Sequence, residues 1–375
     1  MDRRAGARCV AMEDCSDTAP PVDRSSAAAG GRLAAAGRPA DTLKVPPIRC
    51  RRLRAAVLPL ALVALLTLAP GASAAWFAAD SVFNAPVAGA ALDPNSPQLV
   101  AQLASAAAQH ASIQTTSYST PVYTVPADQP PVRVQLDQAS APALQAALAA
   151  VPVPLNAKPS QGTDGNVVVW QPATDTMWEF WRFRSALDGF HAAWAGRIAG
   201  VSTSPGFMRD LKAPDGSWLE RRFWGVTATK LAKAGGLIRA RELASGTIDH
   251  ALAISIPNPR AAMWAAPAEA TDGTGGPTAV PEGAHFRLRP GLNLDRLDLP
   301  PVTRTLAEAA QKYGIIVNNG GAAVAFYAET PTGNYNPYPA LFGGVRPYAL
   351  AKAFPWKDLQ LLKMDLWTKA GPVGG

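Results

Sequence analysis

The sequence predicts a mainly β fold, a β-sandwich or jelly-roll-like single domain with several short peripheral helices, and an α+β fold is the alternative. Three observations favour this class. Short runs of β-branched and aromatic residues recur between turn residues, helical patterns are few and short, and no repeat or low-complexity linker divides the chain after residue 75. With 48% hydrophobic and 17% charged residues, the 375-residue chain has the composition of a globular protein.

The first 74 residues have the pattern of a leader. Residues 50–74 combine an arginine-rich start, an apolar run at 55–69 and the small residues Ala72, Ser73 and Ala74, which predicts a secretory signal peptide cleaved near Ala74. The run is shorter than the roughly twenty residues that span a bilayer, and an uncleaved anchor is the alternative. Residues 1–49 lack apolar periodicity and are expected to be a disordered extension, or to precede the true start codon. We therefore expect a secreted globular domain over residues 75–375, typical of exported bacterial proteins.

Charge and cysteine content narrow the functional classes. Residues 1–74 hold eleven Lys and Arg against six acidic residues, so the net charge of +7 falls to +2 for the remainder. This balance argues against a nucleic-acid partner, and no membrane contact is expected after cleavage. All three cysteines, Cys9, Cys15 and Cys50, precede the expected cleavage site, which excludes disulfides and thiolate chemistry from the secreted domain.

Four helices are expected from apolar periodicity, Pro at the start and Gly at the end. In chain order they cover residues 95–110, with Ser96 as the N-cap, then 141–152, 235–246 and 301–314. The last has Leu306, Ala309 and Ala310 on one face and Gly314 just past its end.

The expected strands lie between these helices. Residues 121–128 and 131–137 are expected to form a strand pair at a sheet edge. A hairpin joins Asn166–Trp170 to Thr176–Phe183, followed by a third strand at 189–198. Residues 200–217 and 271–283 are loops, 247–256 is a strand, and 315–329 is a hairpin across an Asn-Asn-Gly-Gly turn. The Pro-, Tyr- and Gly-rich tail after Thr330 is expected to wrap the surface.

Known sequence motifs for nucleotides, serine nucleophiles and zinc are absent from the sequence. The four histidines include no pair at i, i+4 spacing, so no cofactor is expected. Calcium is a minor possibility, because several turn-like segments carry oxygen ligands without the EF-hand spacing: Asp164, Asp272, Asn293, Asp295 and Asp298.

Asp249 and His250 adjoin in the expected strand at 247–256. Because side chains alternate along a strand, the two would point to opposite faces and cannot form a dyad. Asp249 would lie in a row of small residues with room for a ligand. His250 would lie in the apolar row, where a core-edge histidine bonded to a backbone carbonyl is the alternative to a catalytic role.

The strand over Thr176–Phe183 places Glu179 and Trp181 on one face, as a sugar-binding groove does. Apolar neighbours would raise the pKa of Glu179, as a general acid requires. A core strand with Glu179 in an ion pair is the alternative. In the following strand His191 and Arg197 suit an anionic sugar, with Arg neutralising a uronate and His removing a proton.

These observations predict a secreted carbohydrate-active enzyme that cleaves glycosidic bonds of an extracellular or cell-wall polysaccharide, as a glycosidase or a polysaccharide lyase. The ten tryptophans also favour a glycan partner. The catalytic candidates are Glu179, Asp249, His250 and His191, and the substrate-binding candidates are Trp178, Trp181, Arg182, Trp194 and Arg197. The alternative is a non-catalytic carbohydrate-binding or structural surface protein.

Overall fold

The structure is a computed structural model that describes residues 76–138, 141–208, 211–212, 218–220 and 224–373. These residues belong to one compact unit. The expected extension at 1–49 and signal peptide at 50–74 lie outside the described residues.

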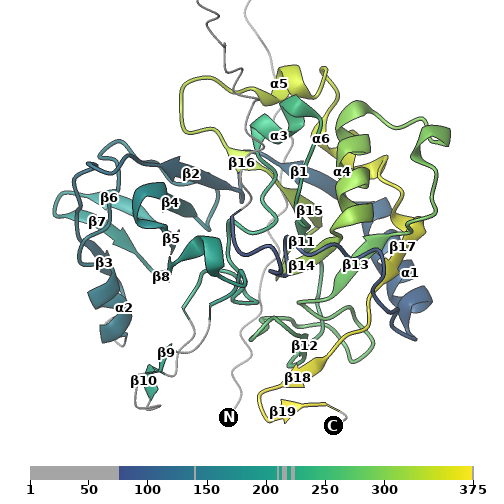
Figure 1. Cartoon of the computed structure of the whole chain (residues 1–375), viewed down its shortest axis with the longest axis horizontal. Coiled ribbons are helices and arrows are strands. Elements are labelled where there is room, and N and C mark those ends of the chain that lie inside the picture. The colour runs from purple at the N-terminus through teal and green to yellow at the C-terminus, as the bar shows by residue number, and fades with distance from the viewer. Residues whose placement is uncertain (1–75, 139–140, 209–210, 213–217, 221–223, 374–375) are drawn as a thin grey trace, which may run out of the picture. The chain divides into compact units, whose positions relative to one another are not determined.

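A six-stranded mixed sheet forms the centre of one half of the described chain (Figure 1). Its strands, in spatial order, are β1 Ala111–Gln114, β15 Val324–Tyr327, β11 Leu252–Ile256, β14 Ile315–Gly320, β13 His285–Leu288 and β17 Leu359–Leu361. Three helices pack on it: α1 Ser96–Gln109, α4 Pro301–Lys312 and α6 Pro347–Lys352. In α4, Leu306 and Ala310 face the apolar core, and Gly314, with φ of +91°, ends the helical turn.

A second apolar core lies in the other half, on the left of Figure 1. It is built on a five-stranded sheet and a three-stranded sheet. The first has the order β16 Glu329–Thr330, β2 Thr120–Thr124, β4 Val167–Gln171, β5 Thr176–Trp181 and β8 Trp194–Ala199. The second has the order β3 Val134–Leu136, β7 Gly189–Ala192 and β6 Arg184–Ala186, with helix α2 Pro142–Ala147 beside it.

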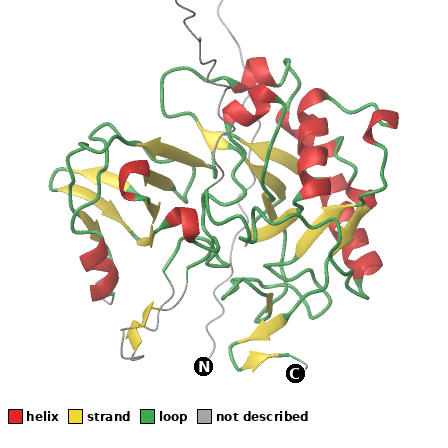
Figure 2. Ribbon diagram, viewed as in Figure 1, coloured by secondary structure: helices red, strands yellow, loops and turns green. Residues whose placement is uncertain are grey.

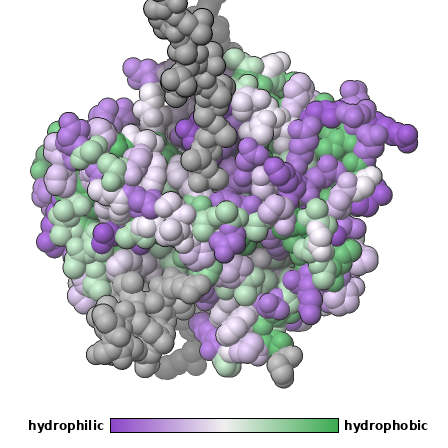
Figure 3. All heavy atoms as spheres, in the orientation of Figure 1, coloured by the Kyte–Doolittle hydropathy of each residue, from purple (hydrophilic) through white to green (hydrophobic). Residues whose placement is uncertain are grey.

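The remaining described elements are short (Figure 2). Besides short 3₁₀ turns, they are helices α3 Ala240–Ser245 and α5 Tyr338–Leu341, and strands β9 Leu211–Lys212, β10 Trp218–Glu220, β12 Trp264–Ala265, β18 Leu366–Thr368 and β19 Gly371–Pro372. Over the described part of the face shown in Figure 3, polar and apolar residues are interspersed. Among the described residues, no helix is long and apolar enough to cross a membrane.

The sheet-rich character that the sequence predicts is confirmed, and the described helices are few and short. The sheets are mixed, with parallel pairs such as β1–β15, β11–β14 and β2–β4 beside antiparallel ones. This arrangement agrees with both the mainly β and the α+β expectation, whereas the finer sandwich or jelly-roll topology is not shown by these pairings.

Several expected elements are confirmed. All four expected helices form, although α2 and α3 are shorter than the patterns indicate. The expected hairpin of β4 and β5 forms, with Val169 opposite Trp178. The expected strand at 189–198 is divided into β7 and β8, and only β8 joins this hairpin, because β7 belongs to the three-stranded sheet. Residues 285–288 and 359–361 form strands that the sequence did not indicate.

Other expectations are wrong for identifiable reasons. β14 and β15 do not form a hairpin, because β11 lies between them and pairs with both. β2 and β3 belong to different sheets. The expected strand at 247–256 begins only at Leu252, so the assignment of Asp249 and His250 to opposite strand faces does not hold. Ser96 is the first residue of α1 rather than its cap, and its hydroxyl accepts a hydrogen bond from the Leu361 N–H at 2.8 Å.

Candidate functional site

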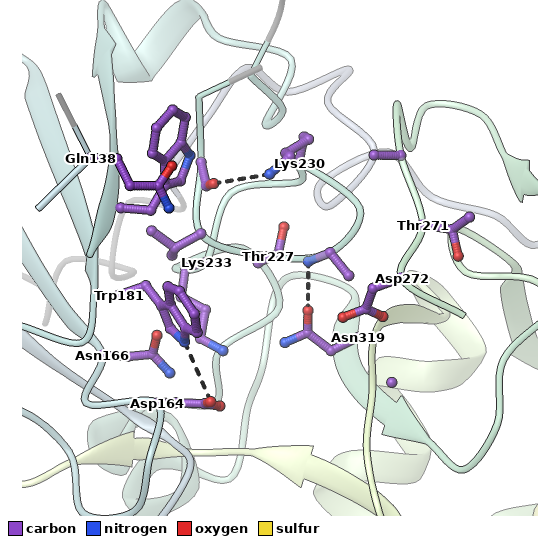
Figure 4. A pocket seen from close by; sticks show the side chains of 16 residues that line it. Gln138, Asp164, Asn166, Trp181, Thr227, Lys230, Lys233, Thr271, Asp272 and Asn319 are labelled. Carbon is purple, nitrogen blue, oxygen red and sulfur yellow. Dashed lines mark hydrogen bonds between the residues drawn. The ribbon is translucent and has the colours of Figure 1, made fainter. Parts of the chain in front are cut away.

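A cavity of about 670 Å³ lies where the two halves meet. Its wall draws on the end of β5, the start of β8, the end of β14 and four connecting segments (Figure 4). The lining residues that carry polar or aromatic side chains are Gln138, Asp164, Asn166, Trp181, Trp194, Thr227, Lys230, Lys233, Thr271, Asp272 and Asn319. The cavity has the size and the mixed apolar and polar lining of a small-molecule site.

Two tryptophans form the aromatic part of the wall. Trp181 ends β5 and Trp194 begins β8, and they stand directly opposite each other in the antiparallel ladder. Cross-strand partners project from the same face of a sheet, so both indoles reach the cavity. The Trp181 indole N–H donates to Asp164 Oδ1 at 3.4 Å, which ties the ring to the segment before β4 (Figure 4).

Residues 225–236 form the floor of the cavity. Glu179 of β5 lies beneath this segment and is hydrogen-bonded to its backbone. The Glu179 side chain is fully buried, and its carboxylate accepts a hydrogen bond from the backbone N–H of Lys233. Burial raises the pKa of Glu179 to about 7, and the neighbouring backbone N–H groups of Lys233, Ala234 and Val226 oppose that increase. Glu179 therefore positions the floor of the cavity.

A close backbone contact fixes the same segment to β8. The Gly225 N–H donates to the Ala195 carbonyl at 3.0 Å. A Cβ atom on Gly196 would lie 2.8 Å from the Gly225 nitrogen, and Gly225 itself has a φ of +101°. Glycine at both positions allows the floor to approach β8.

Lys230 and Lys233 bring amines to this floor. Lys233 is only 5% exposed, and its amine lies 4.6 Å from the centre of the Tyr327 ring. Burial lowers the pKa of Lys233, while the charges of Asp164 and Glu179 act in the opposite direction. Burial also lowers the pKa of Lys230, whose ammonium donates to the Gly225 carbonyl at 3.3 Å.

The wall opposite the tryptophans is fixed by a β-bulge and a buried acid. The register of β11 and β14 shifts between Ile254 and Ser255, and the bulged strand directs Asn319 to the cavity. Asn319 Oδ1 accepts from the Ala228 N–H at 2.8 Å. Its amide nitrogen faces the Tyr327 hydroxyl, because a hydrogen bond from Asn319 acts to lower the pKa of Tyr327, which burial raises.

Asp272 lies at the rim and is held by Glu282. Glu282 Oε2 accepts from the Thr271 hydroxyl at 2.6 Å and from the Asp272 N–H at 3.0 Å. Burial raises the pKa of Glu282 to about 7, and the charge of Asp272 adds to the increase. The buried glutamate thus fixes the turn that presents Asp272.

The structure brings some of the sequence candidates to the cavity and leaves others away from it. Trp181 and Trp194 line it. Arg182 is exposed and stacks on the Trp181 ring, with its guanidinium carbon 4.2 Å from the ring centre. Trp178 is buried, and the exposed Arg197 lies over it at 6.0 Å.

The catalytic candidates do not meet at the cavity. Glu179 is buried beneath it, whereas Asp249 is exposed, 3.5 Å from the Lys312 amine. His250 is buried, with Nδ1 2.8 Å from the Ala251 carbonyl and Nε2 3.2 Å from Glu242, as in the core-edge alternative. His191 lies on β7, where its Nε2 is 2.9 Å from Asp188. The geometry therefore does not support a carboxylate pair of Glu179 and Asp249.

Sequence reasoning missed the two lysines and both asparagines, and it identified Asp164 and Asp272 only as calcium candidates. Both lysines lie in the apolar segment 225–239. Because lysine is rarely buried, their presence in such a segment could have indicated a functional role. Of the other calcium candidates, Asp295 pairs with Arg304 at 2.9 Å. In the part of the chain that the structure describes, no group of three or more His, Cys, Asp or Glu side chains is placed to hold a metal ion.

No protein-family model matches the chain, and neither a curated protein nor a solved structure matches it.

Proposed function

We propose that the protein is a secreted carbohydrate-active enzyme that binds a polysaccharide in the cavity of Trp181, Trp194 and Lys233 and cleaves its glycosidic bonds. The leader pattern of residues 50–74 supports export. The observation that carries the proposal is the cross-strand pair of Trp181 and Trp194 beside polar side chains of several kinds.

The chemistry of the wall suits a sugar. An indole offers an apolar face to the C–H groups of a pyranose ring, and the polar side chains around it bind hydroxyl groups. Asp164 and Asp272 are hydrogen-bond acceptors, whereas Asn319 and the two lysines supply donors. Because Trp181 is tied to Asp164 and Asn319 to Ala228, part of this wall is ordered before a ligand enters.

The alternative is a protein that holds a glycan without turnover. The two lysines favour an enzyme, since buried amines with a lowered pKa exchange protons near neutral pH more readily than ordinary lysines. A surface that only stacks sugars has no need of such groups.

The test is incubation of the purified protein with a panel of neutral and acidic polysaccharides, with new reducing ends as the readout. We expect product from at least one polymer and a loss of at least tenfold in kcat/KM for Trp181→Ala, since stacking contributes about 1 kcal/mol beyond the buried area. Trp367→Ala is the matched control, because Trp367 lies on β18 and is 39% exposed. Binding without product supports the non-catalytic alternative. If the protein neither binds nor cleaves any polymer of the panel, the proposal is wrong.

A further inference from the structure

Neither amine on the cavity floor forms an ion pair with a described carboxylate, although the charge of Asp272 acts on Lys230 and that of Asp164 on Lys233. Within the described parts of the chain, no carboxylate lies within 4.0 Å of the Lys230 or Lys233 amine. By contrast, the buried Arg239 is paired with Glu242. A cation held away from water is unfavourable unless it is paired, so the floor is built to receive a negative group or to release a proton.

A third donor accompanies the amines. The Asn319 carbonyl oxygen is already bonded to the Ala228 N–H, and its amide also hydrogen-bonds Tyr327, so one of its two amide N–H groups is left for a ligand. Figure 4 shows Lys230, Lys233 and Asn319 around the same space, with Asp164 and Asp272 at its edges. The acceptor side chains suit sugar hydroxyls, and the donors suit an anion.

We infer that the bound sugar is a uronate, whose carboxylate is held by Lys230 and Asn319, and that Lys233 is the base of a β-elimination. This inference rests on the proposed function and narrows it to a polysaccharide lyase. A carboxylate is favoured over a sulfate or phosphate because it acidifies the C–H bond next to it, which gives the nearby amine a proton to remove.

The reaction is balanced with one protein group. The neutral Lys233 amine takes the proton from C5 of the uronate, and that electron pair forms the C4=C5 double bond. The C4–O4 bond breaks, and the Lys233 ammonium returns the proton to O4. The products are an unsaturated uronate and a new sugar hydroxyl, and no oxidant, metal or water is consumed.

The environment of Lys233 supports this role. Burial lowers its pKa and so increases the fraction of neutral amine near pH 7. The bond from its backbone N–H to Glu179 fixes the main chain from which the side chain extends. The charges of Asp164 and Glu179 raise the pKa of Lys233. They therefore stabilise the Lys233 ammonium that forms when the amine has taken the proton.

The test compares a uronate polymer with the same polymer after reduction of its carboxyl groups, and a sulfated neutral polymer is included. Ultraviolet absorbance reports the conjugated double bond, and reducing ends report any cleavage. We expect absorbing product from the uronate polymer alone.

Variants separate the base from the anion site. Lys233→Arg keeps the charge but cannot become neutral, and Lys233→Met keeps the length without an amine. Both should lower kcat at least about a hundredfold, as loss of a general base does, and Lys233→Arg should change KM little. Lys230→Met should raise KM about tenfold through the loss of a charged hydrogen bond. Lys158→Met, at an exposed lysine, is the control, and thermal unfolding checks that each variant is folded.

Three outcomes overturn the inference. Reducing ends without absorbance, or equal cleavage of the carboxyl-reduced polymer, indicate hydrolysis and leave the proposed function intact. Turnover by Lys233→Arg or Lys233→Met at the wild-type rate removes Lys233 as the base. If the protein neither binds nor cleaves any polymer, the result contradicts the proposed function as well as this inference.

Discussion

The carboxylate of Glu179 accepts a hydrogen bond from the backbone N–H of Lys233, and the Lys233 side chain lines the cavity. Glu179 therefore acts from beneath the site through the chain that carries the amine. The sequence suggested Glu179 as a catalytic acid, and its buried place supports a positioning role instead.

The first prediction concerns the pH dependence of turnover. The negative charge of Glu179 raises the pKa of Lys233 against the lowering effect of burial. Glu179→Gln removes that charge, so the pH at which kcat/KM rises should move to lower values. The measurement is a pH profile of kcat/KM on a uronate polymer. A profile that moves to higher pH, or stays in place, contradicts the electrostatic coupling.

The second prediction concerns stability against pH. The pKa of Glu179 is about 7 in the folded protein against an ordinary value of 4.5, so folding favours the protonated acid. That contribution is fully present below about pH 4.5 and is lost as the pH rises through about 7. Glu179→Gln should therefore gain stability relative to the wild type between pH 5 and 8, on the order of 3 kcal/mol.

Urea unfolding of both proteins across this pH range measures the difference. Glu282, whose pKa is also raised to about 7, is present in both proteins and cancels. If the difference in unfolding free energy between the wild type and Glu179→Gln does not change with pH, the raised pKa of Glu179 is contradicted.

The third prediction uses an isosteric change at Asn319. Asn319→Asp keeps an oxygen for the Ala228 N–H but replaces the amide N–H donors with a negative acceptor. Affinity for a uronate oligosaccharide should fall by more than about tenfold, because a donor is lost and like charges oppose each other. The affinity for the carboxyl-reduced oligosaccharide should fall less in the same variant, because this ligand carries no negative charge. Calorimetric titration of both ligands gives the comparison, and equal losses contradict the anion site.

The fourth prediction separates structure from catalysis at His250. This side chain is buried between the Ala251 carbonyl and Glu242, which also pairs with Arg239. His250→Gln should lower the free energy of unfolding by about 1–3 kcal/mol, because it disturbs a buried polar group. Wherever the variant is folded, kcat/KM should be kept. His110→Gln, at an exposed histidine, is the control. A loss of kcat with unchanged stability restores the catalytic hypothesis.

Local patterns in the sequence predicted much of the secondary structure. The helix at 301–312 and the hairpin of β4 and β5 follow from periodicity and turn residues over short distances. The order of strands did not follow, because β11 inserts between β14 and β15 through contacts distant in sequence. The Asn-Asn-Gly-Gly segment has the residues of a hairpin turn. It does not close a hairpin, because β14 and β15 each pair with β11 instead of with each other.

The candidate site was predictable only where one strand carries it. Trp181 and Trp194 lie inside the expected strands at 176–183 and 189–198, and alternation placed Trp181 on one face with Glu179. Lys230 and Lys233 lie in a segment of irregular structure, where no periodicity tells which side chains face a cavity. Their role became visible only with the Glu179 contact and the burial of the floor.

The most direct test of the account is acylation of lysines at neutral pH, read by mass spectrometry with and without a uronate oligosaccharide. Acylation proceeds through the neutral fraction of an amine, which a lowered pKa increases, and a bound ligand covers the amine it contacts. We predict that Lys233 is modified in the free protein and protected by the oligosaccharide, while Lys158 reacts equally in both samples. Modification of Lys233 that the ligand leaves unchanged would contradict the placement of the substrate on this floor.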